Sequence, residues 1–254
     1  MVLEGSGLLH DRVALITGAG SGIGAAVARR FAEEGALLWL NDINTEAFSE
    51  IVEETGASGM VGDASDSEFI NNWVNEAARS HGRIDVLYNN VGVSRHGLLG
   101  DTDDDSWRSQ QRLTLDTCFF ATRAVIPHML KSGGGSIVSM SSGAGIGGQH
   151  GLGGYAAAKA GVISLMETVA TEYGNQGIRA NAVTPGPTAT TPLLAYLDQQ
   201  PGGVEAHTAD LNLARLTTPE EVAATVTWLA CDQSSAISGI CVQSNIRSAS
   251  RRPR

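Results

Sequence analysis

A tyrosine and a lysine stand four residues apart in the segment YAAAK, at positions 155 and 159. If this segment is helical, the spacing places Tyr155 and Lys159 on one face of the helix, a turn apart. An ammonium group beside a phenol favours the phenolate, which is the form that accepts a proton. Ser142 stands thirteen residues before the tyrosine, at the end of a predicted strand. Because such pairs are common by chance, their meaning depends on where the fold places them.

A second candidate site is the glycine-rich stretch TGAGSGIG at 17–24, which follows an apolar run and precedes a helix-like segment. Glycines let the chain turn tightly and approach a pyrophosphate, and the helix that follows offers free amides and a positive dipole end. Glycine-rich turns are common, but a strand, turn and helix at the first crossover predict nucleotide binding. The residues predicted to line this site are Gly18, Ser21, Gly22 and Ile23.

Asp42 ends the second apolar run, twenty-four residues after Gly18. A carboxylate at that point accepts hydrogen bonds from the adenosine ribose hydroxyls and repels a 2′-phosphate. The alternative is an aspartate that caps a helix or shapes a loop. Neither Ser21 nor Ile43 is a base that could bind a 2′-phosphate, so the sequence favours NAD over NADP.

Short apolar runs alternate with longer helix-like segments, and this alternation positions all of these residues. Strands that are apolar throughout and separated by helices predict a parallel sheet buried on both faces. Right-handed crossovers then give an α/β fold, a Rossmann-type doubly wound sheet of about seven strands in a single domain over 1–254. Strands are expected at 12–17, 36–42, 58–63, 84–90, 135–142, 178–185 and 239–244, and helices at 22–35, 45–56, 67–82, 103–130, 153–177 and 218–232.

Residues 186–217 contain no predicted strand and lie between the end of one strand and the next helix. Since ligands of doubly wound sheets bind at the carboxyl ends of the strands, this stretch is a candidate lid. Ser142 also ends a strand, so the same rule places it and the helix of Tyr155 and Lys159 beside the expected nucleotide.

Together these motifs resemble the short-chain dehydrogenase/reductase family in its compact, NAD-preferring, single-domain form. The resemblance covers roughly residues 10–243 and rests on several independent motifs in the right order and spacing. They are TGAGSGIG at 17–24, Asp42, GD at 62–63, NNVG at 89–92, Ser142, Tyr155, Lys159 and PGPTAT at 185–190.

The resemblance implies catalytic roles for three residues. Tyr155 is expected to be the general acid/base that exchanges a proton with the substrate oxygen. Lys159 and the oxidised nicotinamide are expected to lower the pKa of Tyr155, since free tyrosine titrates at about 10. Lys159 also holds the nicotinamide ribose, and Ser142 donates a hydrogen bond to the substrate oxygen. The implied cofactor contacts are Asp63 and Ala64 at the adenine, Asn90 and Gly92 beneath the adenosine ribose and sheet edge, and Pro185, Thr188 and Thr190 at the carboxamide and pyrophosphate.

Two stretches depart from the family pattern. The family's fourth catalytic residue is an asparagine seven residues after a tryptophan, and Trp107 plus seven gives Thr114 here. That asparagine helps to keep a helix distortion in which a main-chain carbonyl holds the water of a proton relay. We expect the hydroxyl of Thr114 to bond the preceding helical carbonyl, and we expect an active enzyme because any residue supplies a carbonyl. The last strand runs into CVQSNIRS without a glycine turn, which implies an altered tail at 245–254, expected to be flexible.

The segment between Ser142 and Tyr155 reads GAGIGGQHGLGG, in which seven of twelve residues are glycine. Missing side chains leave room near the chemistry, so we expect a bulky or cyclic secondary alcohol or ketone, with Gln149, His150 and Leu152 as pocket residues. His150 as a further acid/base group is an alternative. Two other functions stay open: a 3-oxoacyl thioester reductase, which often prefers NADPH, and a catalytically weak NAD-binding regulatory protein.

Composition argues against several other classes. A net charge of −10 argues against nucleic-acid binding as the main role. No apolar stretch approaches the ~20 residues that span a bilayer, and no secretory signal is expected at the N-terminus. Cys118, Cys231 and Cys241 have neither disulfide nor zinc spacing, so we expect reduced thiols in a cytoplasmic protein without a metal. The resemblance adds a homotetramer or dimer packed through 103–130 and 153–177.

Overall fold

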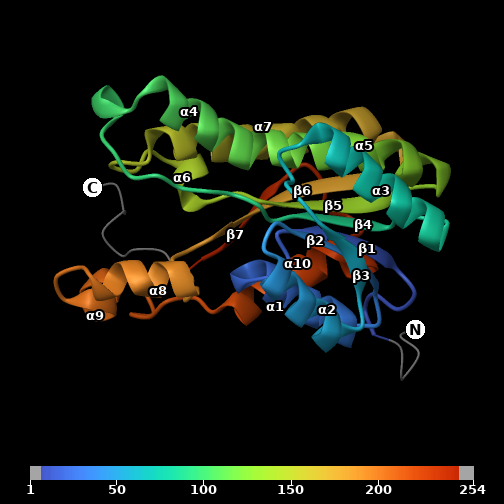
Figure 1. The fold of residues 1–254 in the computed structure, drawn as a ribbon, viewed down its shortest axis with the longest axis horizontal. Coiled ribbons are helices and arrows are strands. Elements are labelled where there is room, and N and C mark those ends of the chain that lie inside the picture. The colour runs from blue at the N-terminus through green and yellow to red at the C-terminus, as the bar shows by residue number, and fades with distance from the viewer. Residues whose placement is uncertain (1–6, 246–254) are drawn as a thin grey trace.

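The computed structural model describes residues 7–245, and the arginine-rich part of the expected tail lies outside this range. Seven parallel strands form one sheet in the order β3-β2-β1-β4-β5-β6-β7, as the doubly wound prediction requires (Figure 1). The switch point lies between β1 and β4, where the strand order reverses. The strands are β1 Val13–Thr17, β2 Leu37–Asp42, β3 Ser58–Val61, β4 Val86–Asn89, β5 Gly135–Met140, β6 Ile178–Pro185 and β7 Cys241–Ser244.

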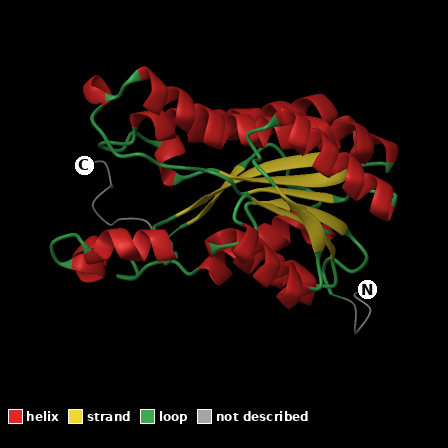
Figure 2. Ribbon diagram, viewed as in Figure 1, coloured by secondary structure: helices red, strands yellow, loops and turns green. Residues whose placement is uncertain are grey.

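Helices cover both faces of the sheet (Figure 2). One face is covered by α1 (Gly22–Glu33), α2 (Thr45–Thr55) and α10 (Pro219–Ala230). The other carries α3 (Ser67–His81), α4 (Asp104–Gln111), α5 (Thr117–Lys131) and α7 (Gly153–Tyr173). Each layer has its own core, around Phe31 on one side and Trp73 on the other, because the strands are apolar on both faces.

Local capping signals fix several helix boundaries close to those predicted. The Asn44 side chain accepts hydrogen bonds from the first-turn amides of α2, and Gly56 ends that helix in the left-handed conformation at φ 66°. Asp66 caps α3 in the same manner as Asn44. Thr218 and Glu221 form a reciprocal capping box at the start of α10. These interactions are local in sequence, which is why the pattern alone locates them.

The single helix expected at 103–130 is interrupted. A π-helix, Arg112–Asp116, separates α4 from α5, and Thr114 lies in its middle. One wide turn shifts the apolar repeat by a single residue, which is too small a change to divide 103–130 into two helices in the pattern. A short helix, α6 (Gly143–Ile146), was also not predicted.

The candidate lid at 186–217 contains two short helices, α8 (Thr191–Asp198) and α9 (Gly203–Thr208). They lie beyond the carboxyl ends of the strands (Figure 1). The lid returns to the fold through Thr217, which accepts a hydrogen bond from the amide of Ala189 at 2.8 Å and donates its own amide to Pro187 at 2.9 Å. The lid is therefore a loop with a closed stem.

All three cysteines are free; Cys118 and Cys231 are buried and Cys241 is half-buried. Within residues 7–245, no helix combines the length and apolar character needed to cross a membrane. Nor do the described residues gather three or more His, Cys, Asp or Glu side chains that could hold a metal ion.

Candidate active site

The glycine-rich loop after β1 has a backbone that only glycines accommodate without strain. Gly18 and Gly22 have φ values of 64° and 53°, which other residues rarely adopt. A Cβ at Gly24 would lie 2.0 Å from the carbonyl oxygen of Gly18, so α1 packs directly on the turn. Ser21 occupies the N-cap of α1 but makes no side-chain bond to the first turn. The loop thus presents the amino end of a long helix without a side-chain cap, as an anion site requires.

Asn90 ties this loop to the end of β4. Its Nδ2 donates to the carbonyl of Gly18 at 2.9 Å, and its backbone amide donates to Oγ1 of Thr17 at 3.2 Å. The hydroxyl of Tyr88 donates to Oδ1 of Asn90 at 3.1 Å. The Asn90 side chain therefore shapes the phosphate loop, a function that its position in NNVG did not reveal.

Asp42 lies against the same loop from the end of β2. Its Oδ2 accepts the amide of Gly20 at 2.8 Å, and its Oδ1 accepts the amide of Asn44 at 2.9 Å. Asp42 therefore also shapes the loop, which was the alternative role considered for it in the sequence. A carboxylate has about four acceptor positions, so two remain for hydroxyl donors. Ile43 beside it is 68% exposed and offers no charge to a 2′-phosphate.

At the end of β3, Asp63 begins a tight turn into α3. Oδ1 of Asp63 accepts the amide and the hydroxyl of Ser65, and Arg112 of the π-helix forms an ion pair with Oδ2 at 3.4 Å. Burial raises the pKa of Asp63, but these hydrogen bonds and the guanidinium outweigh that effect and hold the pKa below its usual value. Ala64 is buried beneath the turn.

The stem of the lid lies over the phosphate loop. A Cβ at Gly22 would meet the methyl group of Thr190 at 3.3 Å. Thr188 is buried, with its hydroxyl bonded to the carbonyl of Gly186 at 3.0 Å. Pro185 is the last residue of β6 and pairs with Ser244 of β7. The predicted residues 185–190 therefore adjoin the loop of the predicted residues 18–23.

Lys159 is the fully buried basic group of the site. Its Nζ donates to the carbonyl of Met140 at 2.6 Å and lies 5.7 Å from the centre of the Tyr155 ring. A Cβ at Gly92 would lie 2.7 Å from the same Nζ, so the glycine of NNVG makes room for the ammonium. Burial lowers the pKa of Lys159 to about 8. A buried lysine that titrates near neutrality is typical of functional sites.

Tyr155 and Ser142 meet in front of this lysine. Burial raises the pKa of Tyr155, and a hydrogen bond with Ser142 offsets part of the rise. Burial therefore outweighs the neighbouring protein groups at Tyr155, and the expected lowering of its pKa, which also involves the oxidised nicotinamide, stays a prediction. Ser142 itself caps α6 and accepts the amide of Ala144 at 3.2 Å. The sequence did not indicate a role for the adjacent Ser141. Its hydroxyl donates to the carbonyl of Lys159 at 2.7 Å and fixes α7 to the end of β5.

Thr114 is completely buried behind Gly92, and its hydroxyl does not bond the preceding helical carbonyl as expected. Its Oγ1 accepts the amide of Val93 at 3.2 Å and lies 3.5 Å from the carbonyl of Val93, to which it donates a weak bond. The Thr114 carbonyl accepts the hydroxyl of Thr117 at 3.2 Å. The π-helix turns Thr114 toward the loop after β4, so the Thr114 hydroxyl bonds Val93 and not the preceding helical carbonyl.

Thr114→Asn should leave activity similar or higher, whereas Thr114→Val should reduce both activity and stability. An asparagine amide carries an acceptor and a donor, so it can serve both backbone groups of Val93. Valine can bond neither group and leaves the buried amide of Val93 without a partner. That loss costs about 1–3 kcal/mol of unfolding free energy. Thermal unfolding of the two variants measures the change in stability, and their initial rates measure the change in activity. A large loss in Thr114→Asn would mean that the local geometry is fitted to threonine.

The glycine-rich segment between Ser142 and Tyr155 is less open than its composition suggested. A Cβ at Gly145 would lie 2.7 Å from the backbone of Lys159, and one at Gly154 would lie 2.7 Å from Nε2 of Gln110. These glycines permit close packing and do not leave empty space. At Gly148 nothing lies within 4 Å. Gln149 and His150 are exposed on the same segment, and Leu152 is half-buried.

An aromatic pair that the sequence did not indicate links the lid to this region. The ring of His96, in the loop after β4, stacks on Tyr196 of α8 with centroids 5.4 Å apart and an interplanar angle of 10°. The neighbouring Gly97 donates its amide to the carbonyl of Gly151 at 2.9 Å. The lid, the loop after β4 and the glycine-rich segment therefore meet at His96.

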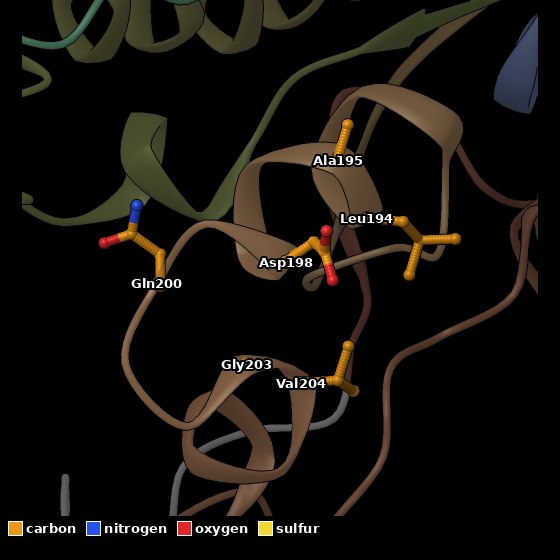
Figure 3. A pocket seen from close by; sticks show the side chains of 6 residues that line it. All are labelled: Leu194, Ala195, Asp198, Gln200, Gly203 and Val204. Carbon is orange, nitrogen blue, oxygen red and sulfur yellow. The ribbon is translucent and has the colours of Figure 1, made fainter.

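The two lid helices border an open hollow of about 480 Å³. Figure 3 shows Leu194 and Asp198 of α8 and Val204 of α9 pointing toward the same space. None of the catalytic candidates lines it. We assign this hollow to the packing of the two lid helices and not to the reaction.

The predicted residues thus form two groups along the carboxyl edge of the sheet. One group combines the catalytic candidates with Gly92, and the other combines the phosphate loop, Asp42 and Asp63. An elongated dinucleotide would need this separation. Three features support the fit of a dinucleotide: the uncapped amino end of α1, the close approach of Gly22 to Thr190, and the free acceptor positions of Asp42.

Comparison with known proteins gives concordant matches. A family model described as enoyl-(acyl carrier protein) reductase matches residues 18–245. The 3-oxoacyl-(acyl-carrier-protein) reductase FabG of Thermotoga maritima is 39% identical over 236 residues, 91% of this chain and 95% of the relative. Cyclohexanol dehydrogenase of Acinetobacter strain SE19 is 36% identical over 243 residues, 92% of this chain and 93% of the relative. The crystal structure of gox2181 matches with a TM-score of 0.89 at 31% identity, covering 94% of this chain and 95% of that one.

Proposed function

The chain belongs to the short-chain dehydrogenase/reductase family, and from that premise we propose that it is an NAD-dependent alcohol dehydrogenase or ketone reductase. The observation that carries the proposal is the group at the end of β5. There the buried ammonium of Lys159 lies 5.7 Å from the centre of the Tyr155 ring, and Ser142 is close enough to Tyr155 to lower its pKa. This is the arrangement that proton exchange with an alcohol or carbonyl oxygen requires.

NAD is the cofactor that the residues of the adenosine end favour. The carboxylate of Asp42 keeps two acceptor positions for ribose hydroxyls, and its charge opposes a 2′-phosphate. The phosphate loop and Thr190 would hold the pyrophosphate, and Lys159 the nicotinamide ribose. The nicotinamide supplies the hydride chemistry when bound.

Tyr155 exchanges the proton in this proposal. Because burial raises its pKa, the phenol is protonated at neutral pH and suits ketone reduction as a general acid. For alcohol oxidation it must act as phenolate, which the positive charges of Lys159 and of the oxidised cofactor favour. Ser142 donates to the substrate oxygen and stabilises charge that develops there. Thr114 supports the loop of Gly92 that leaves space for Lys159.

The substrate class is a bulky or cyclic secondary alcohol or the matching ketone. Apolar side chains are exposed on the elements around the catalytic group, among them Val93 and Ile146. They suit a mostly apolar ligand with few polar groups. The similarity to cyclohexanol dehydrogenase supports the same class. A 3-oxoacyl thioester reductase is the second candidate, favoured by the similarity to the Thermotoga maritima enzyme.

A comparison of two reactions tests the proposal. We expect NAD-linked oxidation of cyclohexanol and related cyclic alcohols at a kcat/KM at least about tenfold above that of NADPH-linked reduction of a 3-oxoacyl thioester, a difference of roughly 1.4 kcal/mol in transition-state binding. The opposite order would favour the thioester reductase. Tight NAD binding without turnover of either substrate would favour a regulatory NAD-binding protein.

We also infer a homotetramer or dimer, located in the cytoplasm. Trp107 of α4 and Phe119 of α5 are each 40% exposed, which leaves aromatic surface on the helices that the sequence identified as packing helices. The guanidinium of Arg123 covers one face of Phe119 at 5.0 Å. Equilibrium sedimentation would give the assembly state directly.

A further inference from the structure

The π-helix contacts the site through its first residue and its middle residue. Thr114 supports the loop beside Lys159, as described above. Two residues earlier, Arg112 reaches the turn after β3, where Nη1 forms the ion pair with Oδ2 of Asp63 at 3.4 Å and donates a hydrogen bond to the hydroxyl of Ser65. The Ser65 hydroxyl in turn donates to Oδ1 of Asp63 at 2.7 Å. The three side chains form a closed network.

This network leaves one acceptor of Asp63 available. Oδ1 already accepts two hydrogen bonds from Ser65, from its amide and its hydroxyl. Oδ2 has the guanidinium of Arg112 as its partner and retains a lone pair. The carboxylate is 41% exposed, so a ligand can reach it. A charged acceptor that is fixed in orientation recognises an amino group and rejects a carbonyl at the same position.

We propose that Arg112 is a positioning residue for the nucleotide base, which holds Asp63 so that Oδ2 accepts the exocyclic amino group of the adenine. This inference rests on the proposed function, because it takes the base of NAD to lie at Asp63. The hydrogen bonds from Ser65 and, after them, the guanidinium of Arg112 lower the pKa of Asp63. Without Arg112, the carboxylate loses its second support and its selectivity between an amino group and a carbonyl.

The electrostatic gain must be modest in the free protein. Arg112 and Asp63 are 51% and 41% exposed, and pairs of that exposure contribute little in water. A bound base would cover the pair and reduce its screening, so the effect should be seen in ligand affinity and not in stability.

The test compares two dinucleotides by titration calorimetry: NAD, and nicotinamide hypoxanthine dinucleotide, which has a carbonyl in place of the adenine amino group. We expect the wild type to bind NAD about tenfold more tightly than the hypoxanthine analogue, since an unpaired acceptor is costly. Arg112→Met should reduce this preference to about twofold, because the carboxylate is no longer held. Arg112→Lys should retain most of the preference.

Arg108→Met is the matched control, because Arg108 lies one turn earlier and its ion pairs within residues 7–245 are with exposed Asp104 and Asp105. It should bind both dinucleotides as the wild type does. Asp63→Asn should lose the preference, and adding Arg112→Met to it should change nothing further. The proposal is overturned if Arg112→Met keeps the wild-type ratio, or if it weakens both dinucleotides equally. A wild type that binds neither dinucleotide would overturn the proposed function as well.

Discussion

Tyr155→Phe should lower kcat by about a thousandfold, within the range of general acid/base contributions, while the Kd for NAD changes less than about twofold. The substitution removes one hydroxyl, so the ring stays above Lys159 and only the proton-exchanging group is lost. Stopped assays of alcohol oxidation give kcat, and calorimetry gives the Kd. Tyr173→Phe is the control, because Tyr173 ends the same helix far along the chain from the site.

Retained turnover in Tyr155→Phe would overturn the proposed mechanism. A parallel loss of NAD binding would mean instead that the hydroxyl has a structural role. Ser142, which lies near Tyr155 and lowers its pKa, gives a further check on the mechanism. Ser142→Ala should lower kcat by roughly a hundredfold, since it removes one donor to the substrate oxygen.

Asp42→Ala combined with Ile43→Arg should move the cofactor preference toward NADP, with the ratio of kcat/KM for NAD to that for NADP falling by at least about a hundredfold. The first change removes a charge that repels the 2′-phosphate, and the second adds a guanidinium that binds it. Both changes alter the surroundings of the 2′ position, where the two cofactors differ. Initial rates with each cofactor, at a saturating alcohol concentration, measure the ratio.

Some loss of overall activity is expected in this double variant. Asp42 also accepts the amides of Gly20 and Asn44, so its removal loosens the phosphate loop. Ile43→Arg alone is the control that keeps these bonds; it should shift the ratio by a smaller factor, because Asp42 still opposes the phosphate. An unchanged ratio in the double variant would contradict the assignment of Asp42 to the adenosine ribose.

The sequence predicts the features that depend on local pattern. Apolar strands, capping residues such as Asn44 and Thr218, and glycines with left-handed backbone follow from neighbours a few residues away. Family motifs add the identities of the site residues. What the sequence cannot show is which groups satisfy one another across the fold. The bonds of Asn90 to Gly18 and of Arg112 to Asp63 join segments that are 72 and 49 residues apart.

Two expectations left out an effect of burial or packing. For the pKa of Tyr155, the sequence argument considered the charges of Lys159 and of the oxidised nicotinamide but not burial, which raises this pKa. The glycines at 145 and 154 looked like open space, but they lie in contact with Lys159 and Gln110. Composition shows that a side chain is missing; it does not show whether a neighbour fills its place.

The measurement that tests the central claim most directly uses cyclohexanol carrying deuterium on its carbinol carbon. After incubation with the protein and NAD, the reduced cofactor is isolated and its mass is determined. The account predicts that the reduced cofactor gains one deuterium in the wild type and that Tyr155→Phe forms labelled cofactor about a thousandfold more slowly. Failure of the wild type to produce labelled reduced cofactor from any cyclic secondary alcohol, while it still binds NAD, would contradict the account.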